Sequence, residues 1–275
     1  MSEHPLKETN LAIIGGGNMA TALIQGLIRS GMPADAIRVS EPDPERRRIL
    51  ASLGVTSSND NATLVRESSL VVIAVKPKVV PSVLREIAPC LEKEALVVSI
   101  AAGITCATLS ASLPPGQPVL RAMPNTPALI GEGVTVVCPT SHVGSLRIQQ
   151  AETLLQTVGV VRMVHDESLI DGVTALSGSG PAYVYLILEA LSDGGVACGL
   201  PRDLADLLAV QTLKGSAALV QETGLHPGVL KNQVTSPGGT TIAALRILEE
   251  AGLRGILMRA VAAAWQRSRE LGIPS

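Results

Sequence analysis

Short runs of aliphatic and β-branched residues alternate with helical segments over residues 1–165 of the chain. The runs are apolar throughout rather than at every second position, which is typical of strands that are covered on both faces. They predict strands at residues 11–14, 37–40, 70–75, 96–100 and 119–121. Between them, Gly31 ends a predicted helix at 18–30, and Asp43 followed by Pro44 begins another helix. This alternation predicts a doubly wound, mostly parallel α/β sheet. Two further strands, at 134–138 and 158–164, flank a helix at 142–156 and extend the sheet at one edge.

The pattern changes after about Asp166, where strand-like runs vanish. Segments rich in Ala and Leu, separated by glycine-containing loops, predict helices at residues 181–198, 202–222, 240–250 and 253–271. Parts of these helices are apolar on every side, and a helix of that kind is buried against something. In so small a domain, the covering surface is a second copy of the chain. We therefore predict a sheet domain at 1–165 and an all-α dimerisation domain at 166–275.

Composition narrows the class of protein. The chain has 275 residues, of which 46% are hydrophobic and 17% charged, so it folds around a real core. With one Trp, two Tyr and no Phe it lacks stacking platforms for nucleic acid, and a net charge of −2 gives no general attraction to nucleic acid or membranes. Four scattered cysteines without a C-x-x-C pair indicate reduced thiols rather than disulfides or a metal site. The start of the sequence lacks a signal-peptide pattern, so we expect a cytoplasmic protein without a bound metal.

The turn after the first predicted strand reads Gly15-Gly16-Gly17-Asn18-Met19-Ala20. This is the G-x-G-x-x-A form of the dinucleotide fingerprint: the first glycine makes a tight turn, the second lets the backbone approach the pyrophosphate, and Ala20 permits close helix packing. The pattern is weak alone, but the next strand ends with Ser40-Glu41-Pro42 near the spacing of a ribose contact. The first domain is thus predicted to be a Rossmann-type dinucleotide-binding domain, and the alternative is a tight structural turn.

The residues after the second strand leave the choice of cofactor open. Glu41 would accept a hydrogen bond from the 2′-hydroxyl of NAD, whereas one of Arg46, Arg47 and Arg48 would reach the 2′-phosphate of NADP. Arginines on an exposed helix face are also often merely solvated. The motif does not decide between NAD and NADP.

Three further segments follow predicted strands, and doubly wound sheets bind ligands at the carboxyl ends of their strands. Ala74-Val75-Lys76-Pro77 is expected to border the cofactor, although Lys76 is equally well an ordinary surface lysine. Ser99-Ile100-Ala101-Ala102-Gly103 ends another strand, and its small residues would let a flat nicotinamide ring lie close. Asn125 is either a polar contact to the nicotinamide or a plain turn residue.

The helical half contains two glycine-rich loops, at 176–182 and 234–241, each predicted to open a helix. Free backbone N–H groups, hydroxyls and the positive end of a helix dipole together suit a small carboxylate. Helix capping and close packing are a sufficient explanation for the first loop, but less so for the second, where four hydroxyls accompany two glycines.

Few acid–base groups accompany these motifs. The four histidines stand in no triad-like setting, and the chain has no carboxylate cluster and no G-x-S-x-G elbow. Oxidation of an alcohol requires a His or Lys base, whereas reduction of a cyclic imine requires little beyond a hydride and correct placement. The sequence favours the second reaction.

Taken with these motifs, the sequence resembles the pyrroline-5-carboxylate reductase family along essentially its whole length. The resemblance rests on residues 14–20, 74–77, 176–183 and 193–196, and above all on Val234-Thr235-Ser236-Pro237-Gly238-Gly239-Thr240-Thr241. It implies reduction of 1-pyrroline-5-carboxylate to L-proline by NAD(P)H, the last step of proline biosynthesis. It also implies a Rossmann domain, an all-α dimerisation domain whose helices interleave between subunits, and further assembly of dimers to a decamer.

The resemblance and the positions after the strands together give a set of site residues. The cofactor, NADP or NAD, is expected at Ile14, Gly15, Gly16, Gly17, Asn18, Met19, Ser40, Glu41, Pro42, Asn61, Ala74, Val75, Lys76, Pro77, Ile100, Ala101, Ala102 and Asn125. The substrate is expected at Glu167, Gln233, Ser236, Gly239, Thr240 and Thr241. The resemblance implies that Thr241 is the catalytic residue and forms a hydrogen bond with the imine nitrogen. The family often has Asn where this chain has Gln233.

Two other functions compete with this interpretation. A β-hydroxyacid dehydrogenase or related imine reductase would carry a lysine on the helix after Gly180, and this helix has none. A non-catalytic redox sensor that binds NAD(P) would not need the hydroxyl-rich loop at 234–241.

Overall fold

The computed structural model describes Leu6 and residues 9–272. Its contacts divide the chain into two compact units. The first, called the sheet unit here, comprises Met1–Ser179 and Ala264–Ser275; the second, called the helical unit, is Gly180–Ala263. Each unit is described by itself.

Within the described residues, eight strands form one sheet in the order β3-β2-β1-β4-β5-β6-β7-β8. Their bounds are β1 Leu11–Ile14, β2 Arg38–Ser40, β3 Thr56–Ser58, β4 Leu70–Ile73, β5 Leu96–Ser99, β6 Val119–Met123, β7 Gly133–Pro139 and β8 Gly159–Met163. All neighbours pair in parallel except β6 and β7, which are antiparallel. The doubly wound sheet and its extension at one edge are therefore confirmed.

Strand β3 is the one strand that the hydrophobic pattern did not predict. Its residues are Thr, Ser and Ser, and it pairs only with β2 at the edge of the sheet. An edge strand with little burial needs no apolar run, so the sequence carried no signal for it.

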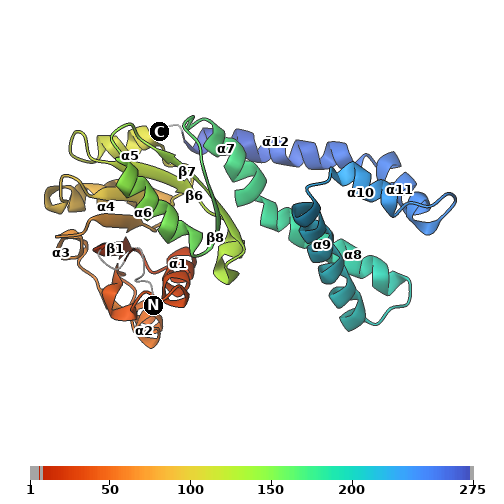
Figure 1. Cartoon of the computed structure of the whole chain (residues 1–275), viewed down its shortest axis with the longest axis horizontal. Helices are drawn as coiled ribbons and strands as arrows, with labels where there is room; N and C mark the ends of the chain where they lie inside the picture. Colours follow the sequence, from red (N-terminus) through yellow and green to blue (C-terminus); the bar gives the residue numbers. More distant parts are fainter. Residues whose placement is uncertain (1–5, 7–8, 273–275) are drawn as a thin grey trace. The chain divides into compact units, whose positions relative to one another are not determined.

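Both faces of the sheet are covered, which explains the continuous apolar runs. Alternate residues of a strand point to opposite faces, so Leu11 and Ile13 of β1 enter one core while Ala12 and Ile14 enter the other. Helices α1 (Asn18–Arg29) and α6 (Ser145–Gln156) contact each other over the first core (Figure 1). The second core is covered by α3 (Asn61–Val65), α4 (Val80–Ile87) and α5 (Cys106–Ala111).

The helix ends follow local sequence chemistry. Helix α2 (Pro44–Ser52) begins as predicted, because the Asp43 side chain accepts a hydrogen bond from the N–H of Glu45 and proline occupies the first position. Helix α6 begins at Ser145, after the N-cap Gly144, so the predicted start at residue 142 is wrong.

The helical unit consists of helices joined by short turns. They are α8 Gly180–Ala197, α9 Arg202–Thr223, α10 Pro227–Gln233, α11 Thr240–Glu250 and the start of α12 (Leu253–Leu271). Helices α8 and α9 lie side by side (Figure 1), and the absence of a side chain at Gly195 allows close approach to Ala205. No helix of the described residues is long and apolar enough to cross a membrane.

The predicted loop at 176–182 is wrong in its first part. Helix α7 (Leu169–Val173) continues directly into a π-helical turn, Thr174–Gly178, and α8 follows from Gly180. The N–H of Ser179 bonds to the carbonyl of Thr174, five residues back, and the Ser177 hydroxyl donates to the carbonyl of Val173. Glycine and serine suggested a loop, but here these residues form a local widening of a helix.

Candidate functional site

The residues expected at the cofactor gather at one edge of the sheet. The register pairs Ile14 with both Ser40 and Ile73, and Ser99 pairs with Ile73 and Arg121. The carboxyl ends of β1, β2, β4, β5 and β6 therefore lie along the same edge. The strand order also reverses between β1 and β4, which is where doubly wound folds bind dinucleotides.

The fingerprint turn has the backbone that its glycines predict. Gly15 has a φ of +100°, and a Cβ there would lie 2.6 Å from the carbonyl oxygen of Ala74, so no side chain fits. Gly17 is the N-cap of α1; its backbone is extended and it has no side chain to cap the helix. The carbonyl of Gly17 accepts a hydrogen bond from the N–H of Thr21. The first-turn N–H groups of α1 are thus left to bind an anion.

Glu41 is buried against the fingerprint turn. Its Oε2 accepts from the N–H of Gly16 at 2.6 Å, and its Oε1 accepts from the N–H of Asp43 at 2.9 Å. The carboxylate therefore braces the turn itself, a contact that sequence spacing could not reveal.

The structure separates the three arginines that the sequence left equivalent. Arg47 donates to the carbonyls of Glu41 and Pro42, and Arg48 pairs with Glu45 on the exposed face of α2. The guanidinium of Arg46 instead lies beside Gly17, 3.2 Å from the position that a Cβ would take there. Arg46 is consequently the arginine placed next to the N-terminus of α1.

The remaining cofactor candidates differ in how they are held. Ser40 is buried, and its carbonyl accepts from the N–H of Gly15. Asn61 begins α3 and donates to Glu86 at 3.0 Å, while Lys76 is exposed just before the 3-10 turn Pro77–Val79. The Oδ1 of Asn125 accepts from the N–H of Val134 at 2.9 Å, so this side chain braces its turn.

The substrate candidates Gln233, Ser236, Gly239, Thr240 and Thr241 gather in the helical unit, where α10 ends and α11 begins. Gly239 is the extended N-cap of α11 and supplies no side-chain cap. A Cβ at Gly239 would lie 2.3 Å from the Ser236 hydroxyl oxygen, so a side chain there would require the Ser236 hydroxyl to move. The Thr235 hydroxyl is already used, because it donates to the carbonyl of Lys231. The start of α11 thus offers unblocked N–H groups together with the hydroxyls of Thr240 and Thr241.

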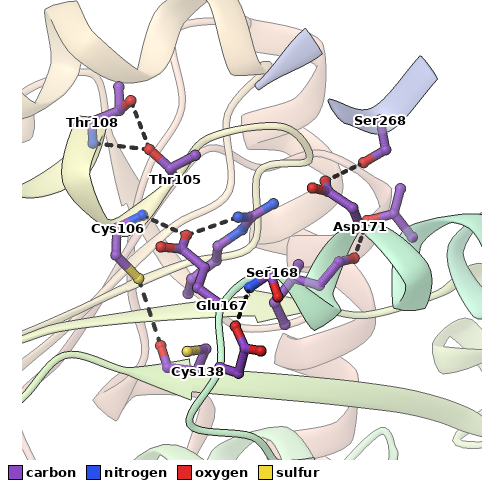
Figure 2. A network of polar contacts seen from close by, with 12 residues as sticks. Thr105, Cys106, Thr108, Cys138, Glu167, Ser168, Asp171 and Ser268 are labelled. Carbon is purple, nitrogen blue, oxygen red and sulfur yellow. Dashed lines mark hydrogen bonds and ion pairs between the residues drawn. The ribbon is translucent and has the colours of Figure 1, made fainter. Parts of the chain in front are cut away.

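Glu167, the sixth substrate candidate, lies in the sheet unit in a network that Figure 2 shows. Its Oε1 accepts from Nη1 of Arg121 at 2.8 Å and from the N–H of Cys106 at 2.7 Å. Arg121 was not predicted as a functional residue. Its signal was present, because a charged residue inside the apolar run of β6 requires a buried partner.

Two thiols border this network. Burial, with a contribution from the Glu167 carboxylate, raises the pKa of Cys106 to about 12, and burial also raises the pKa of Cys138. Both thiols are therefore protonated at physiological pH, and the thiolate form that a nucleophilic cysteine needs is disfavoured.

The chain matches two protein families. Residues 167–271 match the family described as "Pyrroline-5-carboxylate reductase dimerisation", and residues 10–103 match "NADP oxidoreductase coenzyme F420-dependent". A pyrroline-5-carboxylate reductase of Pisum sativum is 46% identical over 264 residues, covering 95% of both chains.

Solved structures agree with this similarity. A pyrroline-5-carboxylate reductase of Coxiella burnetii superposes with a TM-score of 0.91 at 36% identity, covering 97% of this chain and 99% of the other. The pyrroline carboxylate reductase of Plasmodium falciparum, solved with NADP bound, gives a TM-score of 0.88 at 32% identity with the same coverage.

Proposed function

The chain belongs to the pyrroline-5-carboxylate reductase family, and on that premise we propose how its residues carry out the reaction. It is an oxidoreductase that reduces 1-pyrroline-5-carboxylate to L-proline in proline biosynthesis, with NADP as cofactor. The observation that carries this function is the match over nearly the whole length, which includes both the dinucleotide-binding half and the dimerisation half.

The residues at the sheet edge fit a dinucleotide. Gly15 leaves no room for a side chain, and Gly17 leaves the start of α1 uncapped for the pyrophosphate. When bound, the cofactor supplies the hydride. We assign its binding to the eighteen predicted residues, and we add Arg46, whose place beside Gly17 suits a 2′-phosphate.

The start of α11 is our candidate for the substrate. 1-Pyrroline-5-carboxylate offers only a carboxylate and a ring nitrogen as polar handles. The uncapped N–H groups near Thr240 suit the carboxylate, with Gln233, Ser236 and Gly239 shaping the turn before them. The Thr241 hydroxyl then orients the imine nitrogen, which gains a proton as the imine carbon gains the hydride.

We further propose that the enzyme is a cytoplasmic homodimer whose dimers assemble to a decamer, and that it binds neither nucleic acid nor membranes. The matched dimerisation family and the exposed apolar side chains of the helical unit support the dimer. We place the functional boundary at residues 165/166, because β8 ends at Met163 and the dimerisation match begins at residue 167.

The test is direct. Purified protein is mixed with NADPH and racemic 1-pyrroline-5-carboxylate, and the loss of absorbance at the nicotinamide band is compared with the formation of proline by chromatography. We expect one proline for each NADPH oxidised. A protein that binds NADPH but forms no proline would support the sensor function instead.

A further inference from the structure

Arg121 places a charged guanidinium inside the sheet unit. Only 3% of the residue is exposed, and a guanidinium stays protonated at any physiological pH. A buried charge of this kind requires an opposite charge, which Glu167 supplies at 2.8 Å. The ion pair joins strand β6 to the segment just before α7, 46 residues further along the chain.

The same carboxylate oxygen holds a second element. Glu167 Oε1 accepts from the backbone N–H of Cys106, the first residue of α5 (Figure 2). Thr105 caps this helix by accepting from the N–H of Thr108 at 3.1 Å. Glu167 therefore fixes the point where the loop at 100–105 enters α5.

The loop at 100–105 is held at other points as well. The N–H of Ile100 donates to the carbonyl of Ile73, which anchors the end nearer to β5. Near its middle, Gly103 has a φ of +75°, and a Cβ there would lie 3.5 Å from Cβ of Leu271, at the end of α12. That end of α12 is fixed in turn, because the Ser268 hydroxyl donates to Asp171 of α7 at 2.7 Å (Figure 2).

From these contacts we propose that Arg121 and Glu167 form a positioning pair that fixes the loop at 100–105 for hydride transfer. The inference rests on the proposed function, because that function assigns Ile100, Ala101 and Ala102 to the nicotinamide side. Glu167 acts on this loop through the N–H of Cys106, and its predicted contact with the substrate is a separate role. A displacement of about 1 Å at a reacting group can cost on the order of 100-fold in rate, so a loop fixed at its entry to α5 affects catalysis directly.

One hydrogen bond can be deleted with little other change. Cys106→Pro removes the N–H that Glu167 accepts, and proline is favoured at the first position of a helix. The preceding residue, Thr105, already has the extended backbone that a following proline requires, with φ −79° and ψ 158°. Cys106→Ala is the matched variant, because it also lacks the thiol but keeps the N–H.

We expect Cys106→Pro to have a kcat about tenfold below that of Cys106→Ala, with KM for 1-pyrroline-5-carboxylate within about twofold. The deuterium isotope effect with NADPH labelled at C4 should increase, because hydride transfer becomes more rate-limiting. Melting temperatures measured for both variants identify any purely structural loss, which would not change the isotope effect. Identical kinetics for the two variants would overturn the proposal.

The ion pair itself is tested by Glu167→Gln, Arg121→Met and the double variant. Residues that act as a pair give non-additive effects, so the double variant should lose no more kcat than the worse single variant. A role of Glu167 confined to binding substrate predicts a different result: Glu167→Gln would raise KM for 1-pyrroline-5-carboxylate with kcat unchanged, and Arg121→Met would leave both constants unaltered. That result would overturn the proposal.

A binding measurement that requires no catalysis can test this proposal independently of the proposed function. The fluorescence of bound NADPH reports the surroundings of the nicotinamide, so its intensity should differ between Cys106→Pro and Cys106→Ala at saturating NADPH. If the wild-type protein forms no proline, the proposed function fails while this difference still supports the positioning pair. Equal fluorescence and equal kcat in the two variants would refute the pair alone.

Discussion

The two units of the chain bury their apolar side chains in different ways. In the sheet unit, the residues of the central strands β1, β4 and β5 and the inner faces of α1, α4 and α6 are almost completely buried. In the helical unit only Ala205, Ala209 and Ser192 are buried, while Leu186, Leu207 and Met258 are more than 60% exposed. The sheet unit therefore makes its own core, whereas the helical unit has an apolar surface that water would disfavour. The contrast supports our proposal that another copy of the chain covers the second unit.

The largest effect is expected when an exposed leucine of each unit is replaced by aspartate. Leu207 on α9 and Leu146 on α6 are both 63% exposed. We expect Leu207→Asp to abolish both the dimer and the activity, because burying an unpaired carboxylate at an interface costs several kcal/mol. Leu146→Asp should keep the molar mass in light scattering and at least half of the activity. A dimeric, active Leu207→Asp variant would show that this face of α9 is not an interface.

This contrast also explains how much of the fold was predictable. The strands β1, β4 and β5 and the helices α11 and α12 followed from apolar runs and periodicity. Edge strand β3 could not be predicted in this way, because it is polar and little buried. The π-helical turn at Thr174–Gly178 could not be predicted either, because its glycine and serine composition is the composition of a loop.

A second test concerns the hydroxyl at the start of α11. Thr241→Ala should lower kcat/KM by roughly one to three powers of ten, or about 1.4–4 kcal/mol, because the hydroxyl no longer orients the imine. The NADPH dissociation constant should stay within about twofold, since the cofactor residues belong to the sheet unit. Thr241→Ser should recover most of the loss, because it keeps the hydroxyl. A defect confined to cofactor affinity would remove Thr241 from the reaction and assign it to the other ligand.

A third test exploits two glycines that hold the same position in different helices. Gly17 and Gly144 are both extended N-caps of long helices in the sheet unit, α1 and α6. A valine at 17 would occupy the space in which the backbone approaches the pyrophosphate. We expect Gly17→Val to raise the NADPH dissociation constant about 10–50-fold, or roughly 1.4–2.3 kcal/mol. Gly144→Val should leave it unchanged, because nothing lies within 4 Å of a Cβ at that position. Equal titration curves would refute the fingerprint assignment.

Within the sheet unit, some parts of the candidate site were more predictable from the sequence than others. The glycine spacing, together with the end of the next strand at Ser40-Glu41-Pro42, predicted the turn at 15–17, because a close approach to phosphate permits no side chain. The ion pair between buried Arg121 and half-buried Glu167 was not predicted, since its partners are 46 residues apart and only the fold of the sheet unit brings them together. For the same reason the sequence could not tell which of three consecutive arginines lies beside Gly17.

The smallest effect that we expect is a change in KM for NADPH that distinguishes Arg46 from the other two arginines. Arg46→Ala should raise KM for NADPH roughly 5–10-fold and leave KM for NADH within twofold, because only NADPH carries the 2′-phosphate that a guanidinium bonds strongly. The effect is modest because about half of the Arg46 side chain is exposed and Asp43 lies 3.9 Å away, so solvent and a carboxylate both weaken the attraction. Raising the salt concentration should shrink the difference between wild type and variant, as expected for a screened charge.

Arg48→Ala is the matched control, since that guanidinium pairs with Glu45 on the exposed face of α2. Arg47 is unsuitable as a control because it donates to the carbonyls of Glu41 and Pro42. An equal loss for NADH and NADPH would mean that Arg46 supports the turn at Gly17 rather than the phosphate. The preference for NADP would then have to come from another residue at the carboxyl end of β2.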